Sequence, residues 1–273
     1  MKLLNTSKLS AEKQRALLAE MIRTDFKLRY QGSVLGYVWS ILKPLFLFAI
    51  LYTVFTQFLR IGAGIPNYGL SLLLGIVLWS FFAEATSGAL KSIVAKGSLI
   101  RKVDIPRHLI PVASVSSAFV NMLLNLVVVF IFAFFTSGNA LSWMTLLIMP
   151  LLLFELVLVT LAAGFFLSSI YVKLRDIDHI WEVAKQALFY GTPIIYPITL
   201  LPHEALQKII MLSPLAQIIQ DARSVVSWSG NPRITDIYAN NLIVLVPIAL
   251  TFLALFIGYK LFSKKSRFFA EYV

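Results

Sequence analysis

The sequence predicts an all-α integral membrane protein, and three observations support this prediction. The 273 residues are 59% hydrophobic, with a mean hydropathy of +0.82. Only 14% are charged, against about 25% in a typical soluble domain. The 46 residues 109–154 contain no Asp, Glu, Lys or Arg and are interrupted only by the polar notch 137–139. Two bilayer-crossing helices joined by a tight turn explain this stretch, since each needs about 20 apolar residues.

The apolar segments predict six transmembrane helices. Their approximate bounds are Gly36–Leu59, Tyr68–Leu90, Leu109–Phe135, Leu141–Ile170, Ile180–Thr199 and Ile237–Leu261. Lys and Arg gather before the first span and after the second, fourth and sixth spans, whereas the intervening loops carry few of them. Because basic loops stay on the cytoplasmic side, we expect both termini in the cytoplasm.

The segment before the first span predicts an amphipathic helix at the cytoplasmic membrane surface. Ser10 is a suitable N-cap for it. Its apolar side chains share one helix face, which the charged side chains mostly avoid. The residues of this face are Leu17, Leu18, Met21, Ile22 and Phe26. Gly32 and Gly36 follow at a spacing that permits close approach of another helix.

The segment between the fifth and sixth spans predicts two short helices on the outer side. Pro202 can start the first helix, and Ser213–Pro214 separates it from the second. Both helices are amphipathic in this interpretation. We therefore expect them to dip into the outer interface or to cap the bundle.

Several ionisable residues fall inside the predicted spans, where a charge is costly and therefore indicates function. They are Lys43, Glu84, Glu155, Glu182 and Lys185. Glu182 and Lys185 are spaced for an ordinary ion pair on one helix, and Lys43 can extend toward the headgroups. Glu155 either meets a polar partner inside the bundle or faces a wet cavity.

The first and fifth spans carry stripes that mix aromatic and polar side chains. One face of the first span has Trp39, Lys43, Phe46, Ile50, Thr53 and Gln57, and the opposite face has Tyr37, Phe48, Tyr52 and Phe55. The stripe of the fifth span is Glu182, Gln186, Phe189, Pro193 and Tyr196. Such stripes suit a path for sugars, but aromatic rings that merely fill gaps between helices give the same pattern.

The sequence lacks the usual signatures of an enzyme. It has neither a phosphate-binding Gly-rich loop nor a Gly-x-Ser-x-Gly elbow. It has no cysteine, and its three histidines have no metal-ligand spacing. The net charge of +11 comes from basic residues beside the spans, which indicates topology rather than nucleic-acid binding. We expect no catalytic residue, metal or cofactor in this chain.

Six segments stand in order along nearly the whole chain. They are 25–36, Trp39 with Lys43–Pro44, 97–107, 175–179, 192–197 and 267–271. Together they resemble the permease subunits of type-2 ABC exporters, in the branch that exports lipid-linked polysaccharides such as teichoic acids and O-antigens. The resemblance implies a single ABC-2-type transmembrane domain over residues 1–273. Within it, 1–31 would be an interface helix, 96–107 a coupling helix and 200–228 the outer gate helices.

The resemblance also implies partners and a location. The permease would form a homodimer in the bacterial cytoplasmic membrane, in contact with membrane lipid. Two copies of a separate ATP-binding subunit would hold ATP and magnesium and drive transport. The substrate would be a polyprenyl-diphosphate-linked polysaccharide.

The resemblance assigns roles to three groups of residues. Contact with the ATP-binding subunit falls to Ser98, Leu99, Ile100, Arg101 and Lys102, with Arg175, Asp176 and Asp178 in a second, smaller contact. The channel would be lined by Tyr37, Trp39, Lys43, Phe46, Phe48, Tyr52, Gln57, Gln186, Phe189 and Tyr196. The diphosphate would meet Arg23, Lys27, Arg29 and Lys43. Ser98 as N-cap and Pro106 as stop would delimit the coupling helix.

Other functions compete with this interpretation. The nearest is a type-2 ABC permease for a small lipid or drug. An ion-coupled carrier should show inverted repeats, which are not evident here. An intramembrane enzyme using Glu84, Glu155 or His179 lacks a second catalytic partner at useful spacing. Which face of the first span lines the channel stays open, as does the polymer, although the basic surplus slightly favours a teichoic acid.

Overall fold

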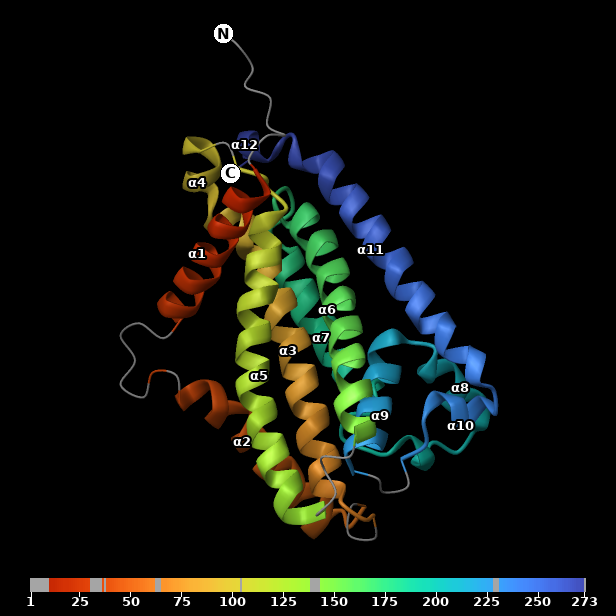
Figure 1. Cartoon of the computed structure of the whole chain (residues 1–273). Helices are drawn as coiled ribbons and strands as arrows, with labels where there is room; N and C mark the ends of the chain where they lie inside the picture. Colours follow the sequence, from red (N-terminus) through yellow and green to blue (C-terminus); the bar gives the residue numbers. More distant parts are fainter. Residues whose placement is uncertain are drawn as a thin grey trace.

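The chain folds into a bundle of long helices, in a computed structural model that describes residues 10–29, 36, 38–61, 65–103, 105–137, 143–227 and 231–272. Its long helices are α2 (Val38–Thr53) with its π-helical extension η1 (Val54–Phe58), α3 (Tyr68–Ala95), α5 (Leu109–Ser137), α6 (Trp143–Tyr171) and α11 (Leu245–Ser266) (Figure 1). Among the described residues, these five are long and apolar enough to cross a membrane. The chain is therefore an all-α, multi-pass membrane protein.

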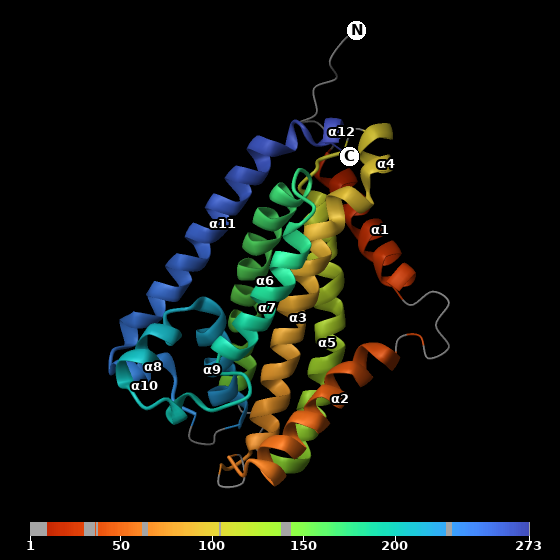
Figure 2. The same ribbon diagram turned by 180° about the vertical axis from the view of Figure 1, so that it is seen from behind.

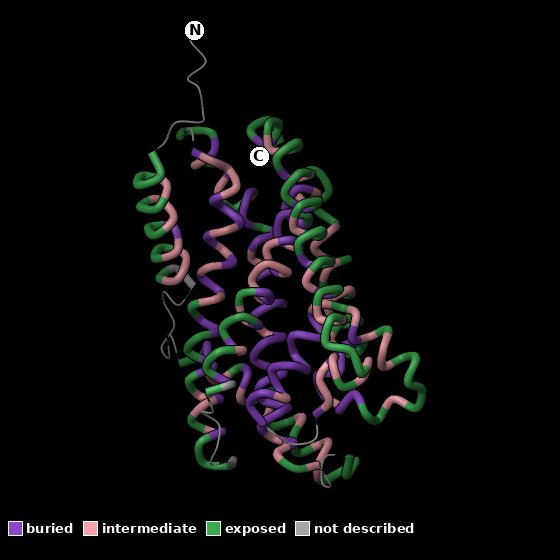
Figure 3. The backbone as a smooth tube through the Cα atoms, turned by 45° about the vertical axis from the view of Figure 1, so that its right-hand side comes forward, coloured by how far each residue is buried: buried purple, intermediate pink, exposed green. Residues whose placement is uncertain are grey.

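Helix α3 forms the centre of the bundle. It packs against α2, α5, α6 and α7, and most of its side chains are buried. Small residues allow the close approach of its neighbours. At Gly164 of α6, for example, an added Cβ would lie 2.9 Å from the Cβ of Ala89. Figure 3 shows the burial concentrated in the middle of the bundle, with exposed backbone on the peripheral helices.

Helices α6 and α11 touch closely near one end and diverge toward the other (Figure 1). The contact depends on Gly258 of α11, where a Cβ would lie 2.6 Å from the carbonyl oxygen of Ala162. The space between the diverging helices is filled by α8 (Glu204–Met211), α9 (Pro214–Ser227) and α10 (Ile234–Tyr238), with η3 (Asn241–Val244) leading into α11.

The predicted fifth span differs from the structure. Helix α7 (Ile177–Gly191) has 15 residues, about 22 Å of helix, which is less than the roughly 30 Å of hydrocarbon. It ends because Thr192 is extended, as is usual before a proline, and Pro193 cannot continue a helix. A turn then leads to η2 (Ile198–Leu200). The predicted range Ile180–Thr199 thus corresponds to a short helix and a broken segment beside α3 (Figure 2).

The prediction of two short helices between the fifth and sixth predicted spans is confirmed, but their details were partly wrong. The first helix begins at Glu204 with His203 as its N-cap, and not at Pro202. The second begins at Pro214, as predicted. Helix α9 does not lie on a surface: its side chains are buried against α3, α6 and α11, with the exception of Pro214 and Ser224. Several of its polar groups, among them the side chains of Asp221 and Arg223, find partners inside the bundle, which makes this burial possible.

One end of the bundle, called here the α4 end, gathers α1 (Ala11–Arg29), α4 (Gly97–Lys102) and α12 (Phe269–Tyr272) (Figure 1). A small hydrophobic cluster joins them to the ends of the long helices. It consists of Met21, Ile93, Ile100, Ile105, Ile110, Ala113, Phe165, Val172, Phe262 and Phe269. The apolar stripe of α1 packs on this cluster and on α5. Ser10 is confirmed as the N-cap, since its Oγ accepts from the Lys13 N–H at 3.4 Å.

Candidate functional site

A cavity of about 950 Å³ lies over α3, between α2 and α7, with α5 as its side wall. We call it the groove. Its polar and charged lining residues are Ser40 and Lys43 of α2, Ser80, Glu84 and Ser87 of α3, Asn121 and Asn125 of α5, and Lys185 of α7. Trp39, Trp79 and Phe81 add aromatic surface. The groove therefore combines hydrogen-bonding groups with flat apolar rings at membrane depth.

A proline in α2 explains one polar contact of the groove. Pro44 has no N–H, so it leaves the carbonyl of Ser40, four residues earlier, without its helical donor. Asn125 of α5 supplies that donor, because its Nδ2 lies 3.2 Å from Ser40 O. The same Nδ2 lies 2.9 Å from Asn121 O. The amide thereby ties the start of α2 to α5 and fixes one wall of the groove.

The polar floor of the groove centres on Glu84 and Asn121. Asn121 Nδ2 donates to Glu84 Oε2 at 3.0 Å. The buried Asn121 Oδ1 has no hydrogen-bond partner among the described residues. It is therefore an acceptor that a bound hydroxyl could use, because a buried polar atom without a partner is otherwise costly.

Helix α7 is attached to α3 by two side-chain hydrogen bonds. Lys185 Nζ donates to Ser87 Oγ at 2.7 Å, and Trp181 Nε1 donates to Thr86 Oγ1 at 3.2 Å. The expected ion pair between Glu182 and Lys185 was wrong: it is absent from the described ion pairs, because Lys185 extends toward the groove instead. Lys43 is exposed on α2, across the groove from Lys185. The described lining of the groove therefore contains two ammonium groups and one carboxylate.

Of the predicted channel residues, Trp39 and Lys43 line the groove, and Phe189 lies behind it. The Phe189 ring packs on Trp79, with ring centroids 5.6 Å apart. The ring of Phe48 packs on Phe132 and that of Tyr52 on Tyr68, with centroids 6.0 and 6.5 Å apart, while Tyr52 keeps part of its surface exposed. The Phe48–Tyr52 face of α2 is thus its packing face within this chain.

The remaining predicted channel residues lie elsewhere. Phe46 is exposed on α2, Gln57 is exposed on η1, and Gln186 is exposed on α7. Tyr196 donates its hydroxyl to Tyr190 O at 3.0 Å. Tyr37 lies outside the described residues. The four described residues of this set do not line the groove, and the contribution of all five to a channel stays a prediction.

Arg223 of α9 holds the broken segment after α7. This guanidinium is completely buried. Its Nε donates to Ser71 O of α3 at 2.8 Å, and its two terminal nitrogens donate to the carbonyls of Pro193 and Ile194. Carbonyls released by a broken helix at membrane depth need such donors. Gly75 makes room for the guanidinium, because a Cβ there would overlap Arg223 Nη2.

Glu155 lies inside the bundle, beside a polar side chain and at the wall of a cavity. It is buried, Thr251 Oγ1 lies 3.4 Å from its Oε1, and it lines a second cavity between α6, α9 and α11. This cavity also receives Asp221. Burial in α9 raises the pKa of Asp221, and the hydrogen bond from Gln217 opposes that rise.

A helix, α4, is present where the coupling helix was predicted, but its bounds differ from the prediction, and its role in coupling stays a prediction. Ser98 is not the N-cap, since the helix begins at Gly97 with Lys96 as N-cap and ends at Lys102, before the extended Val103. Ser98, Arg101 and Lys102 are exposed and Leu99 is half-buried. Ile100 is buried in the cluster at the α4 end, so it anchors α4. Ile100 is therefore not accessible in this structure for contact with an ATP-binding subunit.

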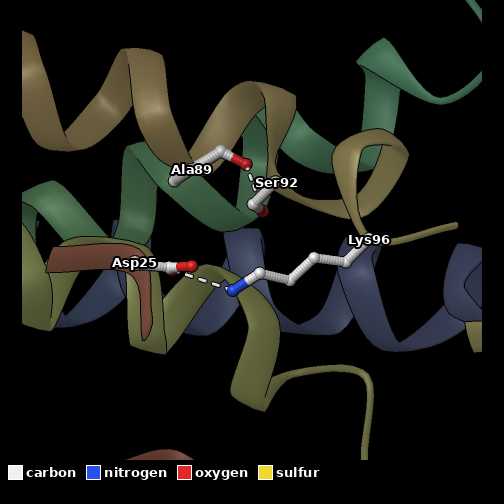
Figure 4. Close-up of polar contacts among 4 residues, drawn as sticks. All are labelled: Asp25, Ala89, Ser92 and Lys96. Carbon is white, nitrogen blue, oxygen red and sulfur yellow. Dashed lines mark hydrogen bonds and ion pairs between the residues drawn. The ribbon is translucent and has the colours of Figure 1, made fainter. Parts of the chain in front are cut away.

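An ion pair connects α4 to α1. Lys96 Nζ lies 2.8 Å from Asp25 Oδ2, and both side chains are largely shielded from solvent (Figure 4). Lys96 follows the last residue of α3, and Ser92 of that turn donates to Ala89 O at 2.7 Å. The pair thus fixes α1 at the junction between α3 and α4.

The second predicted contact lies at the start of α7. Arg175 and Asp176 are exposed. Asp178 pairs with Lys91 at the end of α3, with Nζ and Oδ2 2.7 Å apart.

The residues predicted to meet a diphosphate are only partly described. Arg23 and Lys27 are exposed on α1 and do not line the groove, whereas Lys43 does. The side chain of Arg29 lies outside the described part.

Sequence reasoning singled out Glu84 as an ionisable residue within a span but missed the other polar residues of the groove floor. Ser80, Glu84 and Ser87 recur at helical spacing along α3, and Asn121 and Asn125 are four residues apart on α5. Such a spacing places polar side chains on one face of an otherwise apolar helix. This periodicity was the signal that could have predicted the floor.

Comparison with known proteins identifies relatives along nearly the whole chain. Residues 16–226 match the family described as ABC-2 type transporter. Two Klebsiella pneumoniae proteins named O-antigen export system permease protein RfbA are 30% identical to the chain over 260 and 258 residues, which is 93% of this chain and 94% of each relative. A Myxococcus xanthus protein of the same name is 26% identical over 212 residues, 77% of this chain and 80% of that protein.

Proposed function

Because the chain belongs to the ABC-2 type transporter family, we propose that it is the permease subunit of an ATP-driven exporter of a lipid-linked cell-surface polysaccharide. The names of its relatives favour a polymer of the O-antigen type. They give no support to the teichoic acid that the basic surplus slightly favoured. The chain is a transporter component, and a separate ATP-binding subunit would hydrolyse the ATP.

The groove is the observation that carries this proposal. A glycan has hydroxyls that donate and accept hydrogen bonds, and C–H faces that pack on aromatic rings. The groove offers both kinds of partner, with Glu84, Asn121 and Ser80 beside Trp39 and Trp79. Its volume of about 950 Å³ fits a few sugar units at a time rather than a polymer. A chain of sugars would therefore pass through in steps, in contact with α2, α3 and α7.

The ammonium groups of the groove suit the anionic end of the substrate. Lys43 and Lys185 flank it from α2 and α7, and Glu84 compensates only one of the two charges. A diphosphate at the membrane interface would be attracted to them and to exposed Arg23 and Lys27 on α1. The polyprenyl tail would stay in the lipid while the glycan enters the groove.

Coupling to ATP hydrolysis would occur at the α4 end, which we place in the cytoplasm of a bacterial cell. Exposed Ser98, Arg101 and Lys102 would contact the ATP-binding subunit. The buried Ile100 and the ion pair between Lys96 and Asp25 would pass the movement of α4 to α3 and α1. Two permeases and two ATP-binding subunits would form the complete exporter, so that two grooves face each other.

Reconstitution tests this function. The permease and its ATP-binding subunit are placed together in liposomes, and ATP hydrolysis is measured with and without lipid-linked polysaccharide. We expect the polymer to stimulate hydrolysis. Replacing Arg101 with alanine should abolish the stimulation without lowering the melting temperature, whereas Lys208→Ala on α8 should leave both unchanged. Stimulation by a small lipid or drug and not by the polymer would refute the proposed substrate.

A further inference from the structure

The second cavity lies on the α6–α11 side of α9 and takes no part in the proposed transport path. Its volume is about 380 Å³, which is within the range of small-molecule sites. Most of its walls are apolar, with residues Ile148, Leu151, Leu152, Phe154, Leu158, Val225, Val244, Ile248 and Phe252. Its lining residues come mainly from α6, α9 and α11, with Thr235 of α10 and Val244 of η3.

Glu155 brings a carboxylate into this cavity without a firm hydrogen-bond donor. Thr251 Oγ1 lies 3.4 Å from Glu155 Oε1 and 3.0 Å from Pro247 O. A hydroxyl has a single proton, and the shorter contact with the Pro247 carbonyl uses it best. Glu155 is nevertheless only 8% exposed. A carboxylate in this position needs a donor that the described residues do not fully supply.

Gln217 provides a second unused acceptor in the same cavity. Its side chain is completely buried and lines the cavity. The Nε2 donates to Asp221 Oδ2 at 2.7 Å. The Oε1 has no hydrogen-bond partner among the described residues. This buried oxygen is a second observation, separate from Glu155, and it too would be satisfied by a bound hydrogen-bond donor.

The other polar groups of the cavity are already used. Asp221 accepts from Gln217 and, through Oδ1, from the Ile234 N–H at 3.1 Å. Arg233 is the one basic side chain among the described lining residues, and its Nε donates to Ser224 Oγ at 3.1 Å. Two carboxyl groups thus face one guanidinium. What remains unused among the described lining groups consists of hydrogen-bond acceptors.

We propose that this cavity binds a primary ammonium group carried on an apolar chain. Its N–H groups would donate to Glu155 and to Gln217 Oε1, and its positive charge would compensate the second carboxylate. The apolar part would lie against Leu151, Phe154 and Phe252, which are exposed on the outer surface of α6 and α11. A free long-chain amine carries its ammonium group directly on the apolar chain, and an amine lipid of the membrane carries the same group joined to its acyl chains through a phosphate; both offer a primary ammonium and apolar chains.

A ligand bound in the second cavity would stabilise the position of α9. Asp221 and Arg223 are two residues apart on this helix, so they project to different sides. One side faces the cavity, and the other holds the broken segment after α7 through the carbonyls of Pro193 and Ile194. A ligand in the cavity would therefore fix α9 from the side opposite Arg223. We expect bound amine to raise the melting temperature of the whole permease.

A titration of the purified full-length permease tests this inference. The protein is placed in phosphatidylcholine nanodiscs at neutral pH, and its melting temperature is measured against added dodecylamine, dodecyltrimethylammonium or dodecanol. We expect a saturable rise with dodecylamine and a much smaller one with the other two, which lack an N–H donor. Glu155→Gln should weaken the apparent affinity for dodecylamine roughly tenfold or more. Glu204→Gln, at an exposed carboxylate of α8, should leave it unchanged.

Two further measurements test the proposal if the first variant does not fold, and show whether the bound amine is a membrane lipid or a free amine. Should Glu155→Gln fail to fold, Ile248→Phe, which fills the cavity, must abolish the dodecylamine effect. Native mass spectrometry with added phosphatidylethanolamine identifies the source: retention by the wild type but not by the variant points to the lipid, and retention of dodecylamine alone points to a free amine. Equal stabilisation by dodecanol, or an unchanged affinity in Glu155→Gln, would overturn the proposal.

Discussion

The contact between Arg223 and Gly75 gives the sharpest quantitative prediction. Arg223 donates to three backbone carbonyls, those of Ser71, Pro193 and Ile194. Gly75 leaves the room that its Nη2 occupies. Replacing Gly75 with alanine should displace Nη2 and break its hydrogen bond with Ile194. Replacing Arg223 with glutamine should keep a donor near Ser71 but lose both terminal nitrogens.

The magnitudes follow from these contacts. A hydrogen bond from a charged group contributes about 1.5–3 kcal/mol, and alanine is preferred to glycine within a helix by about 1 kcal/mol. Gly75→Ala should therefore lower the free energy of unfolding of the wild type by about 0.5–2 kcal/mol. In the Arg223→Gln background, the same change should be neutral or stabilising by up to about 1 kcal/mol. Arg223→Gln alone leaves two buried carbonyls without donors and should cost about 2–6 kcal/mol.

The assay is denaturant unfolding of the four proteins of this double-mutant cycle in detergent micelles. The expected coupling energy between Gly75 and Arg223 is about 1.5–3 kcal/mol. Additive effects of the two substitutions would refute the reasoning. So would a destabilisation by Gly75→Ala that is as large in the Arg223→Gln background as in the wild type.

Three further predictions concern packing and the α4 end. Ile100→Ala should lower the free energy of unfolding by about 2–5 kcal/mol, measured by denaturant unfolding, because Ile100 is buried; an unchanged stability would contradict its role as an anchor. Asp25→Lys and Lys96→Asp should each reduce polymer-stimulated ATP hydrolysis, and the double exchange should restore it, unless the ion pair has no part in coupling. Gly258→Ala should lower the melting temperature, because the added Cβ would meet a rigid carbonyl of α6 at 2.6 Å. Gly191→Ala, with no atom within 4 Å of its Cβ, is the matched control and should have little effect.

The hydropathy pattern was sufficient to predict the long helices. Their apolar residues form long, nearly uncharged runs. The bilayer requires such runs whatever the tertiary contacts are, so they can be recognised from the sequence. The pattern did not predict where α7 ends, although Pro193 marks the break. It also did not place α9 inside the bundle, because an amphipathic sequence shows a polar face without showing what that face meets. Here Arg223 meets backbone carbonyls from distant parts of the chain.

The candidate site was predictable only in part. Trp39 and Lys43 were found because they share a face of the first span, and both line the groove. Glu84 was singled out by its charge, but its partner Asn121 was missed because the two residues become a pair only when α5 packs on α3. Ile100 was assigned to a partner contact, but its side chain closes the core at the α4 end. Helical periodicity gives the face of a residue, and packing decides what that face contacts.

Cross-linking from within the groove tests the central claim most directly. A photoreactive phenylalanine analogue is placed at Trp79, which lines the groove, or at Phe154, which is exposed on α6 beside the second cavity. The complete exporter is then illuminated during ATP-driven transport of radiolabelled lipid-linked polysaccharide. We expect the glycan to be captured at position 79 and not at position 154. Capture at position 154 alone, or at neither position while transport continues, would contradict the assignment of the groove as the path of the polymer.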